Sequence, residues 1–303
     1  MKSCACFAGM LMMMLMTLFA QNTQADAVWD SSPEGETLLR SFANAPFPHV
    51  SREKGYTYDK TFFDAPAHYQ DSTVGIFIPA GYRPSETVDY VVHFHGWSNH
   101  VSNVLDQYAL RRQLVESGRN AILLVPQGPK DAQDSSGGRL ESDAGAFAAL
   151  LQEVTAFLQQ EGKIHTAHIG KIVLTAHSGG YRVVGGILTR GGLTEHITDV
   201  LLFDASYGEL EAYTKWATQG HARRLLSIFT RHLAPENFML LTLLQQHRAH
   251  VTSLLEPDLK ESLLQQRQPI LIHTLDLPHD EVLQKRDYFA LFLRTSALPA
   301  IAK

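Results

Sequence analysis

Residues 171–184 read KIVLTAHSGGYRVV. The stretch begins as an apolar, β-branched run, which favours a strand, and continues after Gly180 as a run that can begin a helix. Between the two lies Ser178, with Ala176 two residues before it and Gly180 two residues after it. A serine at the tip of a sharp strand-to-helix turn needs small residues at both positions, because the backbone there is strained and closely packed. The stretch therefore predicts a strand, a tight turn that exposes Ser178, and a helix.

The pattern A-x-S-x-G at residues 176–180 resembles the G-x-S-x-G nucleophile elbow of the α/β-hydrolase superfamily, with alanine in place of the first glycine. The resemblance covers most of the chain after the N-terminal segment, but it rests on a few short motifs. It implies a serine nucleophile at Ser178, followed along the chain by an acid and then by a histidine. The same residues also suit an ordinary strand-to-helix connection, in which serine and glycine serve as turn and cap residues.

Predicted strands and helices alternate from residue 72 to the end of the chain. This alternation indicates an α/β protein with a doubly wound, mostly parallel sheet and helices on both faces, and the resemblance implies the α/β-hydrolase fold. We expect residues 26–303 to form a single domain of this kind. Before residue 72, prolines interrupt the sequence, and we expect one helix near 36–42 and one strand near 56–63. An apolar helical pattern also predicts a helix at 237–255.

Four chemically distinct groups follow predicted strands: Ser178, the pair His95-Gly96, Asp204 and His279. In a parallel sheet the carboxyl ends of the strands meet at one edge, where ligands bind. A serine hydroxyl needs a histidine to accept its proton and an acid to orient that histidine. We therefore predict Ser178 as nucleophile, His279 as general base and Asp204 as the acid. Glu236 is the alternative acid, because the superfamily often places it after the next strand.

The resemblance also implies two backbone N–H donors that stabilise a tetrahedral oxyanion. One would be Gly179, and the other would come from Gly96 or Trp97 in the loop after the strand at 88–94. The His-Gly pair there resembles an element of lipases and esterases, although their additional glycines are absent. Three further residues are expected to contact substrate: His95, Tyr181 and Tyr207.

Composition excludes several other classes of function. The net charge of −5 and a pI near 6.3 give no reason to expect nucleic acid or an anionic membrane as partner. Fifteen histidines are present, but no HExxH motif and no histidine pair with a convincing carboxylate partner is found, so we predict no catalytic metal. No phosphate loop and no GxGxxG after a first strand indicates a nucleotide cofactor, and we predict no cofactor.

The N-terminal segment predicts export. Lys2 precedes an almost wholly apolar run to Ala20, and small residues suited to cleavage follow near residue 25. We interpret residues 1–25 as a secretory signal peptide and expect a periplasmic or secreted protein without stable membrane insertion. An uncleaved membrane anchor is the alternative. Cys4 and Cys6, the two cysteines, both lie in this segment, so the mature chain would contain no disulfide and no cysteine nucleophile.

These predictions combine into a serine hydrolase that acts on a small-molecule or peptide substrate through an acyl-enzyme intermediate. The resemblance makes carboxylic esters the expected substrates. Two alternatives stay open: a peptidase or amidase that uses the same three residues, and a non-catalytic binding protein with the same fold.

Overall fold

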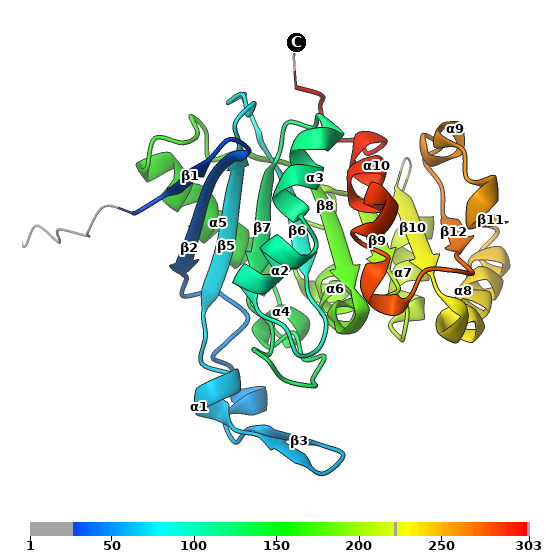
Figure 1. Ribbon diagram of the computed structural model, residues 1–303, viewed down its shortest axis with the longest axis horizontal. Helices are drawn as coiled ribbons and strands as arrows, with labels where there is room; N and C mark the ends of the chain where they lie inside the picture. Colours follow the sequence, from blue (N-terminus) through cyan, green and yellow to red (C-terminus); the bar gives the residue numbers. More distant parts are fainter. Residues whose placement is uncertain (1–26, 221–222, 302–303) are drawn as a thin grey trace, which may run out of the picture.

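A ten-stranded sheet forms the centre of the protein, in the order β1-β2-β5-β7-β6-β8-β9-β10-β12-β11 (Figure 1). The computed structural model describes residues 27–220 and 223–301. The strands from β7 to β11 in this order run parallel, whereas β1, β2 and β5 pair antiparallel with their neighbours. The predicted α/β class and its mostly parallel sheet are confirmed.

The strands of this sheet are β1 (Asp30–Ser32), β2 (Gly35–Ser41), β5 (Thr73–Pro79), β6 (Val88–Phe94), β7 (Ile122–Pro126), β8 (Ile169–His177), β9 (Ile197–Phe203), β10 (Arg224–Phe229), β11 (Thr252–Leu255) and β12 (Ile270–His273). The helices are α1 (Ala65–His68), α2 (Val101–Gln107), α3 (Leu110–Ser117), α4 (Arg139–Ser142), α5 (Ala146–Gln160), α6 (Tyr181–Arg190), α7 (Leu210–Thr218), α8 (Ala234–Gln246), α9 (Glu261–Leu264) and α10 (Tyr288–Arg294).

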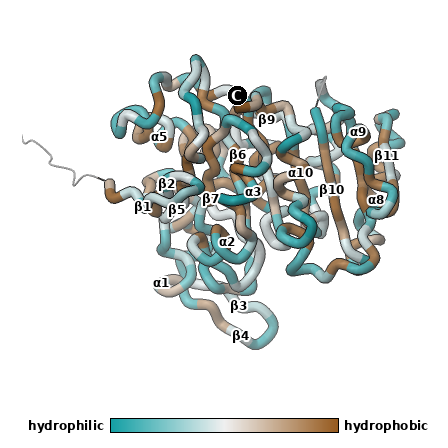
Figure 2. Tube along the Cα trace, turned by 45° about the horizontal axis from the view of Figure 1, so that its top comes forward, coloured by the Kyte–Doolittle hydropathy of each residue, from teal (hydrophilic) through white to brown (hydrophobic). Residues whose placement is uncertain are grey.

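Helices cover both faces of the sheet because successive strand residues point to opposite sides. In β6, Tyr90 and Val92 pack into a core with α5, α6, α7 and α8, whereas Val91 packs into a second core with α2, α3 and α10. Figure 2 shows the central strands as mainly hydrophobic segments between these layers. Burial on both faces explains why these strands read as continuous apolar runs rather than alternating ones.

Three predicted elements differ from the structure. Residues 36–42 were expected to be helical but form most of β2, which pairs with β5 along its whole length; this pairing outweighs a weak local helix preference. The helix expected at 237–255 ends at Gln246, and β11 follows it as an edge strand. The strand expected near 56–63 is a hairpin of β3 (Tyr56–Tyr58) and β4 (Thr61–Phe63).

The hairpin β3–β4 and helix α1 project from one end of the molecule, the end toward which the arrow of β10 points in Figure 1. We call this end, where the parallel strands finish, the carboxyl edge. Arg52 anchors the arm here, because its guanidinium donates to the buried carboxylate of Asp134 at 2.6 and 3.0 Å. This contact ties the N-terminal arm, the segment from β2 to α1, to the loop after β7. Tyr58, in the hairpin of this arm, lies at the carboxyl edge.

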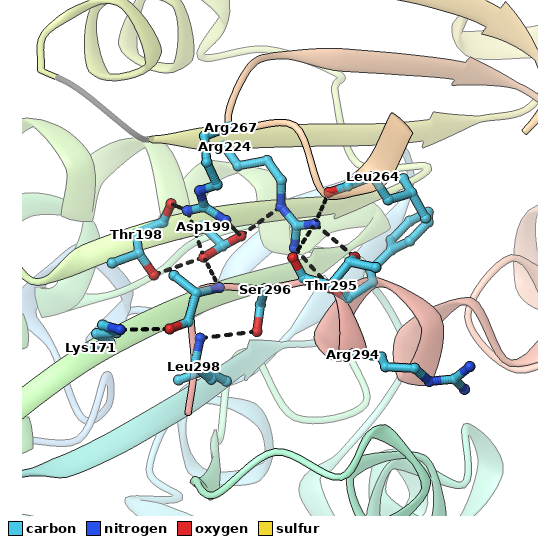
Figure 3. Close-up of polar contacts among 12 residues, drawn as sticks. Lys171, Thr198, Asp199, Arg224, Leu264, Arg267, Arg294, Thr295, Ser296 and Leu298 are labelled. Atoms are coloured by element: carbon cyan, nitrogen blue, oxygen red, sulfur yellow. Dashed lines mark hydrogen bonds and ion pairs between the residues drawn. The ribbon is translucent and has the colours of Figure 1, made fainter. Parts of the chain in front are cut away.

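At the opposite end, which we call the amino edge, a buried ion network joins the starts of β9 and β10 (Figure 3). Arg224 and Asp199 are cross-strand neighbours with no exposed surface. Arg224 Nε donates to Asp199 Oδ1 at 2.6 Å, and Arg267 Nη1 donates to the same oxygen at 2.8 Å. The remaining guanidinium N–H groups of Arg224 donate to backbone carbonyls of α9 and the end of α10: Leu264, Phe292 and Thr295. The network therefore fastens the last helix to the sheet.

The predicted signal peptide at 1–25 lies outside the described residues. Within the described part of the chain, none of the helices has both the length and the apolar character needed to cross a membrane.

Candidate active site

Ser178 lies at the tip of the turn between β8 and α6 and has a φ of +51°. This left-handed conformation is uncommon for a residue with a side chain. The turn is closely packed: a Cβ at Gly180 would lie 2.4 Å from the carbonyl oxygen of Phe94, and one at Gly96 would lie 2.6 Å from Ser178 Cβ. Glycine is therefore required at both positions, and the loop after β6 passes directly against Ser178.

Asp204 and His279 meet at the same edge. Asp204 directly follows β9, is fully buried, and its Oδ2 lies 2.7 Å from His279 Nδ1. Thr230, directly after β10, donates its backbone N–H to Asp204 Oδ1 at 2.7 Å and its hydroxyl to Oδ2 at 2.9 Å. Of the two candidate acids, Asp204 makes the contact with His279, whereas Glu236 lies in the first turn of α8.

The charge on Asp204 is stabilised by its hydrogen bonds. Burial by itself would raise the pKa of Asp204, but the hydrogen bonds from His279 and from the Thr230 N–H, together with the nearby histidines, hold the pKa below its ordinary value. Asp204 is therefore ionised at neutral pH and accepts from His279 Nδ1–H. With Nδ1 as the donor to Asp204, Nε2 is the ring nitrogen left to accept a proton, as a general base requires.

His177 holds the backbone of His279. Its Nε2 lies 3.1 Å from the carbonyl oxygen of His279, the two rings are 4.8 Å apart, and the Tyr108 hydroxyl lies 3.3 Å from His177 Nδ1. Burial, together with the nearby His279, lowers the pKa of His177 to about 4. A neutral His177 donates one hydrogen bond and accepts the other, so both contacts can form at once.

Ser178 and His279 line one cavity, but no hydrogen bond joins their side chains among the residues that the structure describes. The Ser178 hydroxyl lies instead near the phenol of Tyr207. Burial and the charge of Asp204, opposed by the hydrogen bond from Ser178, raise the pKa of Tyr207 to about 12. Rotation of the serine side chain toward His279 is needed for proton transfer, and such contacts often tighten when substrate binds.

A second histidine reaches Asp204 through Thr230. His232 Nδ1 lies 2.6 Å from the Thr230 hydroxyl, and His232 Nε2 lies 2.7 Å from the Tyr207 hydroxyl. Because Thr230 gives its proton to Asp204, it must accept from His232 Nδ1–H. His232 Nε2 then accepts from Tyr207, which leaves the phenol oxygen free to accept another hydrogen bond.

The residues expected at the oxyanion position lie next to one another. A Cβ at Gly179 would lie 2.8 Å from both Trp97 Cδ1 and Ser135 Oγ, so the Trp97 ring packs directly over the turn. The indole of Trp97 is held by its hydrogen bond to Ser135 Oγ at 2.8 Å. Gly96 contacts Ser178 from the same loop.

His95 was predicted to bind substrate, and both of its ring nitrogens have partners within the protein. Its ring is buried, with Nδ1 2.8 Å from the Gly96 carbonyl oxygen. Its Nε2 accepts from the Gly128 N–H at 3.0 Å, which puts the proton on Nδ1, and burial lowers its pKa. Both nitrogens thus have backbone partners, and His95 supports the Gly96 loop; its contact with a substrate stays a prediction.

Two cavities meet at Ser178, and Trp97 and Tyr207 line both. The first, which we call the aromatic cavity, has a volume of about 320 Å³ and includes Tyr58 and Tyr181. The second, which we call the polar cavity, has a volume of about 420 Å³ and includes His279. Its other polar side chains are Ser98, Asn99, Asn103, Gln107, Tyr108, His177 and Asp280. Predicted pocket residues Tyr181 and Tyr207 therefore line the site.

Some of these groups could also serve as metal ligands. Donor atoms of Asp204, His232 and His279 lie within 4.8 Å of one another. Each of these residues already has hydrogen-bond partners, as His279 pairs with Asp204 and His232 lies between Thr230 and Tyr207. The arrangement is satisfied as a hydrogen-bond network without a cation.

Several site residues were missed by the sequence reasoning. Thr230 and His232 directly follow β10, so the argument from strand ends could have found them. His177 precedes the serine and was read as part of the strand. Tyr58 comes from the N-terminal arm, and no local pattern links it to Ser178.

Comparison with solved structures shows shared architecture at low sequence identity. A mutant of the feruloyl esterase module from Clostridium thermocellum, complexed with sinapinate, aligns over 88% of this chain and 89% of its own, with a TM-score of 0.53 and 10% identity. A structure designated FAE aligns over 88% and 89%, with a TM-score of 0.52 and 9% identity. An S-formylglutathione hydrolase from Agrobacterium tumefaciens covers 88% and 97%, with a TM-score of 0.47 and 14% identity.

No protein-family model and no curated protein sequence matches the chain. The similarity to the first two structures, together with the strand order and the strained Ser178 turn, shows that this chain has the α/β-hydrolase fold.

Proposed function

We propose that the protein is a serine hydrolase that cleaves carboxylic esters through Ser178, His279 and Asp204. The contact of 2.7 Å between Asp204 and His279, formed at the same edge as the strained Ser178 turn, carries this proposal. Three residues far apart in sequence meet there, and they supply the nucleophile, base and acid that acyl transfer requires. The fold shared with a feruloyl esterase module agrees with it.

In the proposed reaction, Ser178 Oγ attacks the ester carbonyl carbon while His279 Nε2 takes its proton. Asp204 stabilises the imidazolium that forms. The carbonyl oxygen becomes an oxyanion, for which the N–H groups of Gly179 and of Gly96 or Trp97 are the candidate donors. His279 then protonates the departing alcohol oxygen as the ester C–O bond breaks. Water, deprotonated by His279, hydrolyses the acyl-enzyme and releases the acid.

We propose that the acyl group is aromatic. Four rings surround the aromatic cavity, and no charged side chain is among the described residues that line it. Tyr58 packs edge-on against Trp97 with ring centroids 4.7 Å apart, and Tyr181 lies 5.9 Å from Tyr207. Rings at these separations pack well against a further planar ring. The volume is at the small end of the usual range for ligand sites, which favours one ring over a long acyl chain.

Labelling with a fluorophosphonate probe tests the proposed nucleophile. We expect the wild type to be labelled, and Ser178→Ala and His279→Ala to lose labelling while remaining folded. Ser102→Ala, on the exposed side of α2, is the matched control and should label as the wild type does. A folded wild type that is not labelled would contradict the serine-hydrolase proposal and favour a binding protein. Matched ester and amide substrates then distinguish an esterase from an amidase.

We also propose that the protein is exported, on the basis of the N-terminal segment alone. Mass spectrometry of the protein recovered from the periplasm or medium should show a chain that begins near residue 26. Recovery of a membrane-bound chain that retains Lys2 would contradict cleavage.

A further inference from the structure

If the proposed function holds, the two cavities at Ser178 bind different parts of the ester. The leaving-group oxygen must receive its proton from His279. His279 lines the polar cavity but is not among the residues that line the aromatic cavity. The alcohol therefore leaves through the polar cavity, and the acyl group occupies the aromatic one.

The wall of the polar cavity formed by α2 carries an ordered row of amides. Asn103 Nδ2 donates to Asn99 Oδ1 at 2.8 Å and to Gln107 Oε1 at 2.9 Å. Asn99 is buried, whereas Asn103 and Gln107 are exposed. Their mutual hydrogen bonds orient the amides, and the groups not used in the row, such as the Gln107 NH₂, can bond to a ligand. Side chains of this kind both donate to and accept from hydroxyl groups.

Tyr207 adds an acceptor beside the scissile bond. Its proton goes to His232 Nε2 at 2.7 Å, because His232 Nδ1–H points at Thr230. The phenol oxygen consequently presents lone pairs toward the junction of the two cavities. In the free enzyme the Ser178 hydroxyl lies near this oxygen. When Ser178 turns to His279, a hydroxyl of the substrate can take its place.

The charge of the polar cavity excludes one class of alcohol. Among its described lining residues there is no lysine or arginine, and Asp280 is an exposed acid at its edge. Burial, together with the carboxylate of Asp280, raises the pKa of Tyr108 to about 12. Asp280 acts in the same direction on Tyr207, so its field extends across the cavity. An alcohol with a carboxylate or phosphate would be repelled here.

We propose that the polar cavity is the subsite for the leaving group, and that it takes a neutral, hydroxyl-rich alcohol such as glycerol or a sugar. The amides of Asn103 and Gln107 and the phenol oxygen of Tyr207 bond to its hydroxyl groups. Asp280 disfavours anionic alcohols. This inference rests on the proposed ester hydrolysis and adds the chemical class of the alcohol.

The test varies the alcohol while the acyl group stays cinnamoyl. Four esters are compared by kcat/KM: ethyl, glyceryl, glucosyl and carboxymethyl. We expect the glyceryl or the glucosyl ester, whichever matches the true source of the alcohol, to exceed the ethyl ester, and the carboxymethyl ester to be the poorest. Asn103→Ala and Gln107→Ala should each reduce the ratio of hydroxyl-rich to ethyl ester about 3- to 10-fold, as expected for one lost hydrogen bond.

The charge part of the proposal has its own pair of variants. Asp280→Asn should raise kcat/KM for the carboxymethyl ester relative to the ethyl ester about 3- to 10-fold. Asp276→Asn is the matched control, because Asp276 pairs with Arg286 at 2.7 Å outside the cavity, and it should leave that ratio unchanged. If Ser178 is labelled and the ethyl ester is hydrolysed without any preference among alcohols, the subsite proposal is wrong and the proposed function stands. If Ser178 is not labelled in a folded wild type, both the proposed function and the subsite proposal are wrong.

Discussion

Two buried aspartates lie at the two ends of strand β9: Asp199 near its start and Asp204 directly after its last residue. They differ in the side chains that hold their carboxylates. Asp199, near the amino edge, is held by Arg224 and Arg267. Asp204, at the carboxyl edge, is held by His279 and Thr230. Both carboxylates are fully buried, and for both the partners outweigh burial and lower the pKa.

The difference between the partners fits the different roles that we propose for the two carboxylates. Arginine stays charged at any ordinary pH, so the Asp199 network is permanent and suits the fastening of α10 to the sheet. Histidine gains and loses a proton near neutrality, so the partner of Asp204 can change its charge during a reaction. The same residue type in the same degree of burial thus fastens the sheet at one edge and, in the proposed reaction, supports chemistry at the other.

The sharpest way to break this comparison is the same substitution at both positions. Asp204→Asn keeps the shape and an acceptor for the Thr230 N–H but removes the charge that stabilises a protonated His279. We expect kcat/KM for an ester to fall about 10⁴-fold, equivalent to about 5 kcal/mol, with a folded protein by circular dichroism. Near wild-type activity in Asp204→Asn, with loss in Glu236→Gln, would instead assign the acid to Glu236.

Asp199→Asn should have the opposite profile. It leaves the Arg224 guanidinium buried beside a neutral group, and breaking a buried ion pair in this way costs about 3–5 kcal/mol. Urea unfolding monitored by fluorescence should show this loss, while kcat/KM per folded molecule stays within about twofold of the wild type. A large loss of activity without destabilisation would mean that the amino edge is coupled to the site.

The pH dependence of stability should come from the carboxyl edge. Because His177 is held neutral with a pKa of about 4, the unfolded chain binds a proton below pH 6.5 that the folded chain does not. Stability therefore falls as the pH drops from about 6.5 to 4, by about 3 kcal/mol for this residue. Asp199 has a lowered pKa, so its contribution is present above its unfolded value and is lost only at more acid pH.

Urea unfolding at pH 7 and at pH 4.5 measures this effect. His177→Gln keeps a side-chain N–H but cannot titrate, and its stability should change less between the two pH values than that of the wild type. His93 and His95 are also buried with lowered pKa values, so some acid sensitivity will remain. An equal pH dependence in the variant and the wild type would contradict the assignment to His177.

The sequence predicted the carboxyl edge better than the amino edge, for a physical reason. Ser178, Asp204 and His279 each follow an apolar strand, and the meeting of strand ends in a parallel sheet places them together. Arg224 has no such signal, since it begins an otherwise apolar strand and its partners lie 25 to 71 residues away. Contacts of this kind depend on tertiary packing and leave no local periodicity.

The same limit applies within the site. His279 contacts Asp204, and His232 reaches it through Thr230. The sequence alone could not distinguish these two from the other thirteen histidines, because hydrogen-bond partners decide their roles. His95 was expected to face the substrate on the basis of its position at a strand end, yet the backbone of Gly96 and Gly128 occupies both of its nitrogens. Tyr58 lies on the arm that Arg52 ties to Asp134, and this contact joins segments 82 residues apart.

The smallest expected effect comes from two threonines, because each aspartate also accepts a hydrogen bond from one threonine hydroxyl. These two bonds allow the most closely matched comparison of the two edges. Thr230 donates to Asp204 Oδ2 at 2.9 Å and Thr198 donates to Asp199 Oδ2 at 2.7 Å. Each threonine-to-valine substitution removes one hydrogen bond of nearly equal length to a buried carboxylate, so both should cost about 1–3 kcal/mol of stability.

Their effects on activity should differ. Thr230→Val also removes the acceptor of His232 Nδ1–H and loosens Tyr207, so kcat/KM should fall about 3- to 10-fold, and the pKa of Asp204 should rise toward its ordinary value. Thr198→Val should leave kcat/KM as it is. Equal activity in the two variants at equal stability would show that Thr230 is as purely structural as Thr198. Of the partners of Asp204, only His279 would then matter for the reaction.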